Sequence, residues 1–126
     1  MKLNAVAVSS SNISKTVEFY KILGFEFPEF KEDEQHVESL PKQGEPKLMI
    51  DSHKMMTDIL GYEPKPGNHS SFAIEYSSPT ELNEVAHKLT SAGYTLTKEP
   101  WDAFWGQRYA IASDPDGYKV DLYATL

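Results

Sequence analysis

The chain has no cysteine among its 126 residues. A disulfide, a thiolate metal site and a cysteine nucleophile are therefore excluded. The sequence also lacks any apolar run approaching the roughly 20 residues that a transmembrane helix needs. Its first residues, MKLNAVAVSSSN, do not follow the pattern of a secretion signal. We accordingly expect a cytoplasmic protein that does not enter a membrane.

Positive charge is in short supply, with 12 lysines and arginines against 19 aspartates and glutamates and a net charge of −7. This balance disfavours nucleic acids and anionic membranes as partners, and it suits neutral or cationic small molecules. Neither a glycine-rich phosphate loop nor a serine in a nucleophile elbow occurs in the sequence. No catalytic residue can be assigned from motifs, and whether the protein is an enzyme stays open.

The most specific local signal is the tetrapeptide Asp114-Pro115-Asp116-Gly117. Proline presets the φ angle of a tight turn, and glycine allows the positive φ needed to leave it. The turn separates the strand-like runs 108–113 and 118–124, which predicts a hairpin. The alternation of the second run places Val120 and Leu122 toward a core. Its other face carries Lys119, Asp121 and Tyr123.

Three large rings precede this hairpin, Trp101, Phe104 and Trp105, with Gly106 following. We expect them in a loop, where such rings are unfavourable if left in water. They either pack into the core, or form a dimer contact, or line a pocket. For Trp105 both interpretations stay open, whereas for Trp101 we favour the core.

A strand–helix–strand pattern occurs twice. In the first half, Asn12 and Gly24 bracket a helix, and the Phe-rich run 25–30 and short strands follow. In the second half, Ser78-Pro79-Thr80-Glu81 predicts a capped helix start. We therefore predict one α+β domain. It comprises two βαβββ modules, residues 1–51 and 69–126, joined by a linker at residues 52–68. The modules form a curved, cupped mixed sheet with the helices on its convex face.

The concave face of such a sheet is a natural small-molecule site. Strand alternation assigns to it a set of mainly small and polar residues: Leu3, Ala5, Ala7, Met49, Asp51, Ser71, Ala73, Glu75, Lys119, Asp121 and Tyr123.

The segments SKTVEFYKILGF and DPDGYKVDLYA, with the repeat between them, resemble the glyoxalase/bleomycin-resistance/extradiol-dioxygenase superfamily, also called vicinal oxygen chelate proteins. The resemblance covers essentially the whole chain. It implies paired βαβββ modules, frequent homodimers, and a cupped site that often holds a divalent metal.

The metal positions are where this sequence departs from the family. Matching the strands implies Ala5, Met49, Ser71 and Asp121 at those places. Alanine has no donor atom, methionine is too soft for a hard divalent ion, and a metal site needs about three protein ligands. His69 shares the strand parity of Ser71, and His36 and Asp51 are further donors. We predict no metal, with His69 and Asp121 as the remaining candidates.

We favour a metal-free protein that binds a small molecule between aromatic walls, such as a drug-sequestering resistance protein. The alternative is a lyase, isomerase or dioxygenase of the same superfamily that uses zinc, nickel, manganese or iron with an atypical ligand set. Arg108 pairs with an acid or a ligand anion, or forms a salt bridge at a strand edge. The predicted ligand-binding residues are Phe30, Met49, Ser71, Phe104, Trp105, Arg108, Asp121 and Tyr123.

Overall fold

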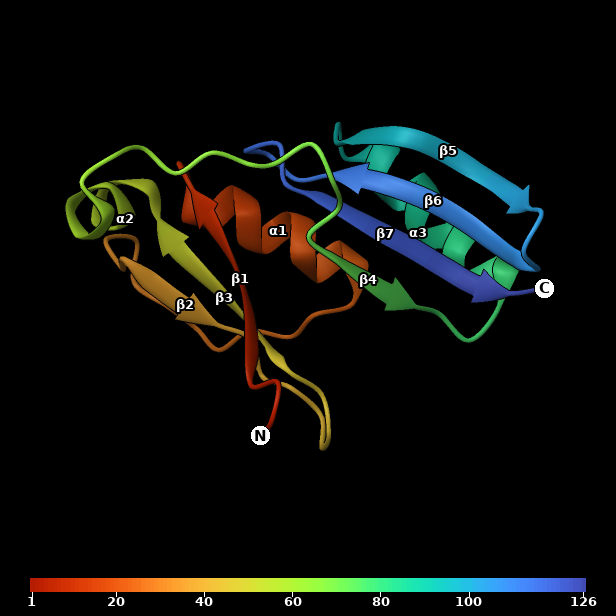
Figure 1. Ribbon diagram of the computed structural model, residues 1–126, viewed down its shortest axis with the longest axis horizontal. Coiled ribbons are helices and arrows are strands. Elements are labelled where there is room, and N and C mark those ends of the chain that lie inside the picture. Colours follow the sequence, from red (N-terminus) through yellow and green to blue (C-terminus); the bar gives the residue numbers. More distant parts are fainter. The chain divides into compact units, whose positions relative to one another are not determined.

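The second half of the chain forms a strand, a helix and three more strands, as its pattern predicts. The computed structural model describes residues 1–126, and this half contains β4 (Phe72–Glu75), α3 (Pro79–Ser91), β5 (Thr95–Ala103), β6 (Gln107–Ser113) and β7 (Lys119–Thr125). The sheet order is β4-β7-β6-β5, with β4 parallel to β7 and the other pairs antiparallel. Helix α3 covers one face of this sheet (Figure 1), and we call the opposite face the open face of the second module.

The predicted hairpin between β6 and β7 is confirmed. In its turn, Asp114 Oδ1 accepts hydrogen bonds from the backbone N–H groups of Asp116 at 2.9 Å and Tyr118 at 3.0 Å. Gly117 has a φ angle of 93°, which a residue with a Cβ rarely adopts. The turn therefore aligns β6 and β7 without a register shift, with Ser113 opposite Lys119.

The start of α3 follows the predicted capping chemistry with one change. Ser78 Oγ accepts from Glu81 N at 3.1 Å, and Pro79 is the first helical residue. The Glu81 carboxylate accepts from Ser77 N at 2.9 Å, one residue before the expected partner. The Ser77 hydroxyl also donates to this carboxylate, at 2.6 Å. The hydroxyl bond first, and then the backbone bond from Ser77, lowers the pKa of Glu81, because both favour the ionised form. The predicted apolar stripe of the helix is buried: Leu82, Val85, Ala86 and Leu89.

The first half forms its own sheet. Its elements are β1 (Ala5–Ser10), α1 (Ile13–Leu23), β2 (His36–Glu38), β3 (Lys47–Ser52) and α2 (His53–Leu60). The order is β1-β3-β2, with β1 parallel and β2 antiparallel to β3. α1 is capped by Asn12 and ends at Gly24, as predicted, and it packs against β3. The face opposite α1 is the open face of the first module.

The Phe-rich run after α1 is not a strand, contrary to the βαβββ pattern expected for the first half. Residues 24–30 contain no strand, and the first sheet has three strands. Phe25 instead packs edge-on against Tyr20, with ring centroids 5.9 Å apart. Pro28 has no N–H group with which to extend a strand ladder. One backbone hydrogen bond, from Leu40 N to Glu26 O at 2.7 Å, ties this run to the segment after β2.

The chain divides into two compact units, Met1–Lys65 and Pro66–Leu126. The division falls inside the segment 52–68 that we interpret as a linker. Much of that segment is the helix α2, which contacts β1 and β3. None of the helices in the structure combines the length and the apolar character needed to cross a lipid bilayer.

Candidate functional site

The open face of the second module places a carboxylate beside aromatic rings. In the pairing of β7, Asp121 lies between Ala73 of β4 and Ile111 of β6. Two residues further along β7, Tyr123 lies beside Tyr109 of β6. The two tyrosine rings are stacked, with an interplanar angle of 16° and centroids 6.0 Å apart.

Five aromatic side chains form a continuous cluster on this face. Trp105 contacts the rings of Phe104, Trp101 and Tyr109 edge-on, with centroid separations of 5.0, 6.1 and 5.4 Å. Tyr109 in turn stacks on Tyr123. Phe104 is 97% exposed and Trp105 48% exposed. A contiguous apolar patch of this kind is a frequent mark of a binding surface.

Two hydroxyl groups hold the carboxylate of Asp121. Tyr109 donates to Oδ2 at 2.6 Å, and Ser70 donates to Oδ1. Burial, followed by the hydrogen bond to Asp121, raises the pKa of Tyr109 to about 12. Tyr109 therefore stays protonated in ordinary buffers and keeps donating to Asp121, which fixes the carboxylate in one orientation.

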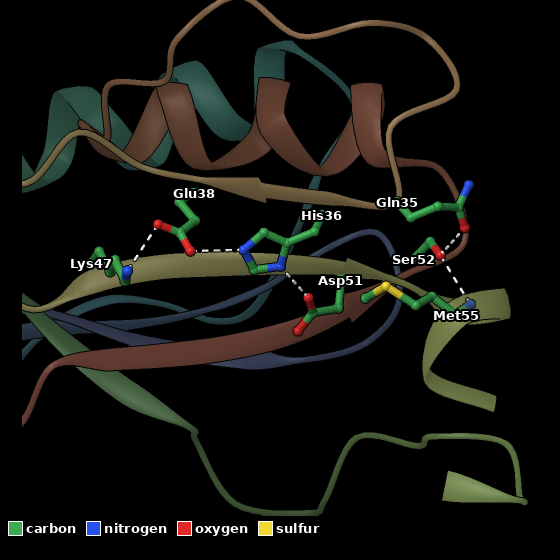
Figure 2. Close-up of polar contacts among 7 residues, drawn as sticks. All are labelled: Gln35, His36, Glu38, Lys47, Asp51, Ser52 and Met55. Atoms are coloured by element: carbon green, nitrogen blue, oxygen red, sulfur yellow. Dashed lines mark hydrogen bonds and ion pairs between the residues drawn. The ribbon is translucent and has the colours of Figure 1, made fainter. Parts of the chain in front are cut away.

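The open face of the first module carries a chain of charged side chains, drawn in Figure 2. His36 on β2 contacts Asp51 Oδ1 through Nδ1 at 2.5 Å and Glu38 Oε2 through Nε2 at 2.8 Å. Lys47 Nζ donates to the other oxygen of Glu38 at 2.8 Å. The bond to Asp51, then that to Glu38, raises the pKa of His36, and Lys47 lowers the pKa of Glu38. We call these four residues the His36 cluster.

Four of the predicted ligand-binding residues come together on the open face of the second module: Phe104, Trp105, Asp121 and Tyr123. Ser71 is exposed and precedes β4, and its backbone N–H donates to Lys119 O at 2.8 Å. Its neighbour Ser70 is the residue whose hydroxyl reaches Asp121.

The other predicted residues lie elsewhere. Arg108 points to the α3 side of its sheet, where it bonds Asn83 at 3.0 Å and Asp102 at 3.1 Å. This is the salt bridge that we kept as the alternative for Arg108. Phe30 lines a shallow groove of about 420 Å³ along α1. Met49 belongs to the first sheet, opposite Ala7 of β1 and Glu38 of β2.

Sequence reasoning missed Tyr109 and Ser70. It named His36 and Asp51 as donors but not the contact between them, and it placed Trp101 in a loop, whereas Trp101 lies in β5. The position of Tyr109 was within reach, because a tight turn aligns β6 with β7 and so sets Tyr109 opposite Tyr123. The His36 cluster joins residues 15 positions apart, His36 and Asp51, and no local signal in the sequence indicates that pairing.

The donor groups do not fit the divalent metal that the resemblance implies. His69 Nδ1 donates to its neighbour Ser70 O at 2.9 Å, and both oxygens of Asp121 accept hydroxyl hydrogens. Ala73 and Ile111, beside Asp121, have no side-chain donor. No group of three or more His, Cys, Asp or Glu side chains is arranged to hold a metal ion. We assign no chemical step to a metal.

Comparison with known proteins places this fold in a family. Residues 2–122 match the family described as the Glyoxalase/Bleomycin resistance protein/Dioxygenase superfamily. The chain belongs to this superfamily, as its two signature segments indicate. No curated protein matches the chain.

Solved structures with similar folds include several members of this superfamily. One from Sphaerobacter thermophilus is 25% identical, with a TM-score of 0.71 and coverage of 98% of this chain and 97% of that one. A glyoxalase-related enzyme from Fulvimarina pelagi is 15% identical, with a TM-score of 0.83 and coverage of 99% and 88%. A lactoylglutathione lyase from Agrobacterium tumefaciens is 16% identical, with a TM-score of 0.69 and coverage of 96% and 91%. The similarity to these last two shows the fold alone.

Proposed function

We propose that the protein binds a small organic molecule, without a metal, on the open face of its second module. The observation that carries this proposal is the exposed aromatic cluster beside Asp121. Phe104 and Trp105 together leave large apolar rings in solvent, which is unfavourable unless a ligand or partner covers them. A flat molecule that stacks on Trp105 would bury that surface.

The carboxylates near the rings suit a cationic ligand. Asp121 lies on the same face as the rings. Glu75 of β4 lies next to Tyr123 of β7 in the strand register. Aromatic rings and carboxylates together attract cations, through the ring quadrupole and through direct charge attraction. Lys98 illustrates this locally, because its Nζ lies 4.5 Å from the centroid of Trp101. More specifically, we propose that the protein sequesters flat cationic drugs.

The proposal is tested by titrating the protein with a cationic glycopeptide of the bleomycin type and with proflavine, a flat aromatic cation. Isothermal calorimetry measures affinity, and quenching of tryptophan fluorescence reports contact with the rings. We expect binding that Trp105→Ala weakens by about 1–3 kcal/mol, the usual effect of removing a ring on which a flat aromatic group stacks. Asp121→Asn should weaken the cationic ligands selectively, because it removes the negative charge.

Tyr62→Ala is the matched control, because Tyr62 is a 66% exposed aromatic residue that belongs to the other compact unit, Met1–Lys65. It should leave binding unchanged. Absence of binding across the panel, or equal affinities for wild type, Trp105→Ala and Asp121→Asn, would contradict the proposal.

We further propose a cytoplasmic homodimer. A sedimentation mass equal to one chain of 14.2 kDa would contradict the dimer.

A further inference from the structure

We propose that Asp51 and Ser9, on the open face of the first module, form a subsite for an alkylammonium group, and that the proton on His36 competes with this cation. The subsite shares no residue with the aromatic face of the second module, and it does not depend on the function proposed there.

The first observation is a buried hydroxyl without a partner. Ser9 is 7% exposed, and its Oγ has no hydrogen-bond partner. A buried hydroxyl in this state is unfavourable, because it has lost its water partners without gaining another. Ser10 Oγ bonds Thr16 of α1 at 2.6 Å, so strand alternation turns Ser9 to the opposite, open face.

The second observation is the position of Asp51 beside that hydroxyl. Ser9 and Asp51 are paired in the register of β1 and β3, and both belong to the open face. The side chain of Asp51 is 14% exposed, and its Oδ1 bonds His36. An N–H donor that bridges Asp51 Oδ2 and Ser9 Oγ would satisfy the hydroxyl and use the second carboxylate oxygen.

The third observation is the protonation that the His36 cluster requires. Both ring nitrogens of His36 lie within 2.8 Å of a carboxylate oxygen. A neutral imidazole has only one N–H, and its other nitrogen would turn a lone pair toward a carboxylate. The geometry is therefore that of a protonated His36, which with Lys47 balances the charges of Glu38 and Asp51.

Loss of that proton leaves the cluster with one negative charge. Glu38 keeps its ion pair with Lys47 at 2.8 Å, whereas His36 is the cation that Asp51 contacts. The uncompensated charge therefore resides at Asp51, which is why the ligand should be a cation and why its affinity should rise with pH.

The neighbouring charged groups do not change this balance. Strand β1, on the other side of β3, carries no titratable side chain. On α2, which contacts both strands, the charged groups pair with each other or with the following loop. Lys54 contacts Asp58 at 3.6 Å, and His53 contacts Glu63 at 3.5 Å.

The test uses ethylammonium chloride on the full chain, with sodium chloride at equal ionic strength as the reference. Nuclear magnetic resonance follows the His36 ring protons through a pH titration. Competition requires the His36 midpoint to fall by about one pH unit when ethylammonium is present at about ten times its Kd. The backbone amide signals of Ser9 and Asp51 should shift over the same concentration range.

Three variants decide the outcome. In Asp51→Asn the His36 midpoint should no longer respond to ethylammonium, and in Ser9→Ala the response should weaken several-fold. Asp121→Asn, in the second module, should respond as the wild type does, which separates this subsite from the aromatic face. An unchanged midpoint in the wild-type protein would overturn the proposal. So would an equal response in Asp51→Asn, and an equal response in Ser9→Ala would remove Ser9 from the subsite.

Discussion

At the scale of single residues, hydrogen-bond partners decide what each carboxylate can do. Asp121 accepts from two hydroxyl groups, whereas Asp51 accepts from a histidine. The first carboxylate is held by neutral donors. The second contacts His36, and this bond is the largest cause of the raised pKa of His36. The two acids therefore have different partners although each lies on the open face of its sheet.

Replacing Asp121 by asparagine should lower the pKa of Tyr109. The present pKa of about 12 arises first from burial and then from the bond to the Asp121 carboxylate, so the variant should move it part of the way back toward 10.0. Carbon-13 resonances of the tyrosine rings measure the midpoint. Ser70→Ala is the control, because Ser70 bonds the other carboxylate oxygen of Asp121, and the Tyr109 midpoint should change little in this variant. A Tyr109 midpoint unchanged in Asp121→Asn would show that burial alone sets it.

His36 should make the folded state more stable in acid than in alkali. Its folded pKa lies above 6.5, so its stabilising effect is complete below 6.5 and is lost as pH rises through the folded value. The side chain is 38% exposed, and solvent screening limits the effect to at most about 1 kcal/mol.

The measurement is urea unfolding of the wild type and His36→Gln at about pH 5.5 and about pH 8.5, on either side of an ordinary histidine pKa. The free energy lost in the variant should be larger at the lower pH. His87→Gln, a histidine on the exposed side of α3, is the control. A loss in His36→Gln that is equal at both pH values would contradict the ion-pair interpretation.

At the scale of elements, turns and caps specify the structure with few residues. Asn12, Ser78 and Gly24 bound their helices as their residue types predict. The Phe-rich run after α1 does not form a strand, although its residues alternate. Alternation alone does not supply a partner strand, and Pro28 lacks the backbone N–H that a strand ladder needs. Strand propensity is decided by pairing, whereas helix ends are decided by neighbours in sequence.

Gly117→Ala should destabilise the hairpin. A Cβ at this position would be strained by the φ of 93°, and it would lie 3.3 Å from Pro66 Cγ. We expect a loss of about 1–2 kcal/mol in the free energy of unfolding. Gly67→Ala is the matched control, because Gly67 has no positive φ and no atom within 4 Å of its added Cβ. Thermal unfolding of both variants measures the difference, and equal melting temperatures would show that the turn tolerates a side chain.

At the scale of the whole molecule, membership of the superfamily and the ability to bind a metal depend on different residues. Superfamily membership rests on residues 2–122, whereas a metal depends on donor atoms at a few strand positions. Ala73 and Ile111 beside Asp121 offer none. This chain therefore combines the superfamily fold with an open face that carries aromatic rings and the Asp121 carboxylate.

We predict that the purified protein carries no stoichiometric metal. Zinc, nickel, manganese and ferrous iron should leave its melting temperature unchanged, because binding to the native state would raise it. Elemental mass spectrometry and thermal shift measure the two quantities on protein prepared without an affinity tag or chelator. Metal near one equivalent, or a clear upward shift that Asp121→Ala abolishes, would instead favour a lyase, isomerase or dioxygenase.

The sequence by itself determined the helix ends, the hairpin with its register, the α+β class and the superfamily. Each depends on residues a few positions apart, where backbone geometry and capping follow from residue type. Only the tertiary structure decided that Ser70 rather than Ser71 reaches Asp121, that Arg108 turns toward α3, and that His36 meets Asp51. Those contacts join distant segments, and their geometry follows from the pairing and packing of whole elements, which no local pattern specifies.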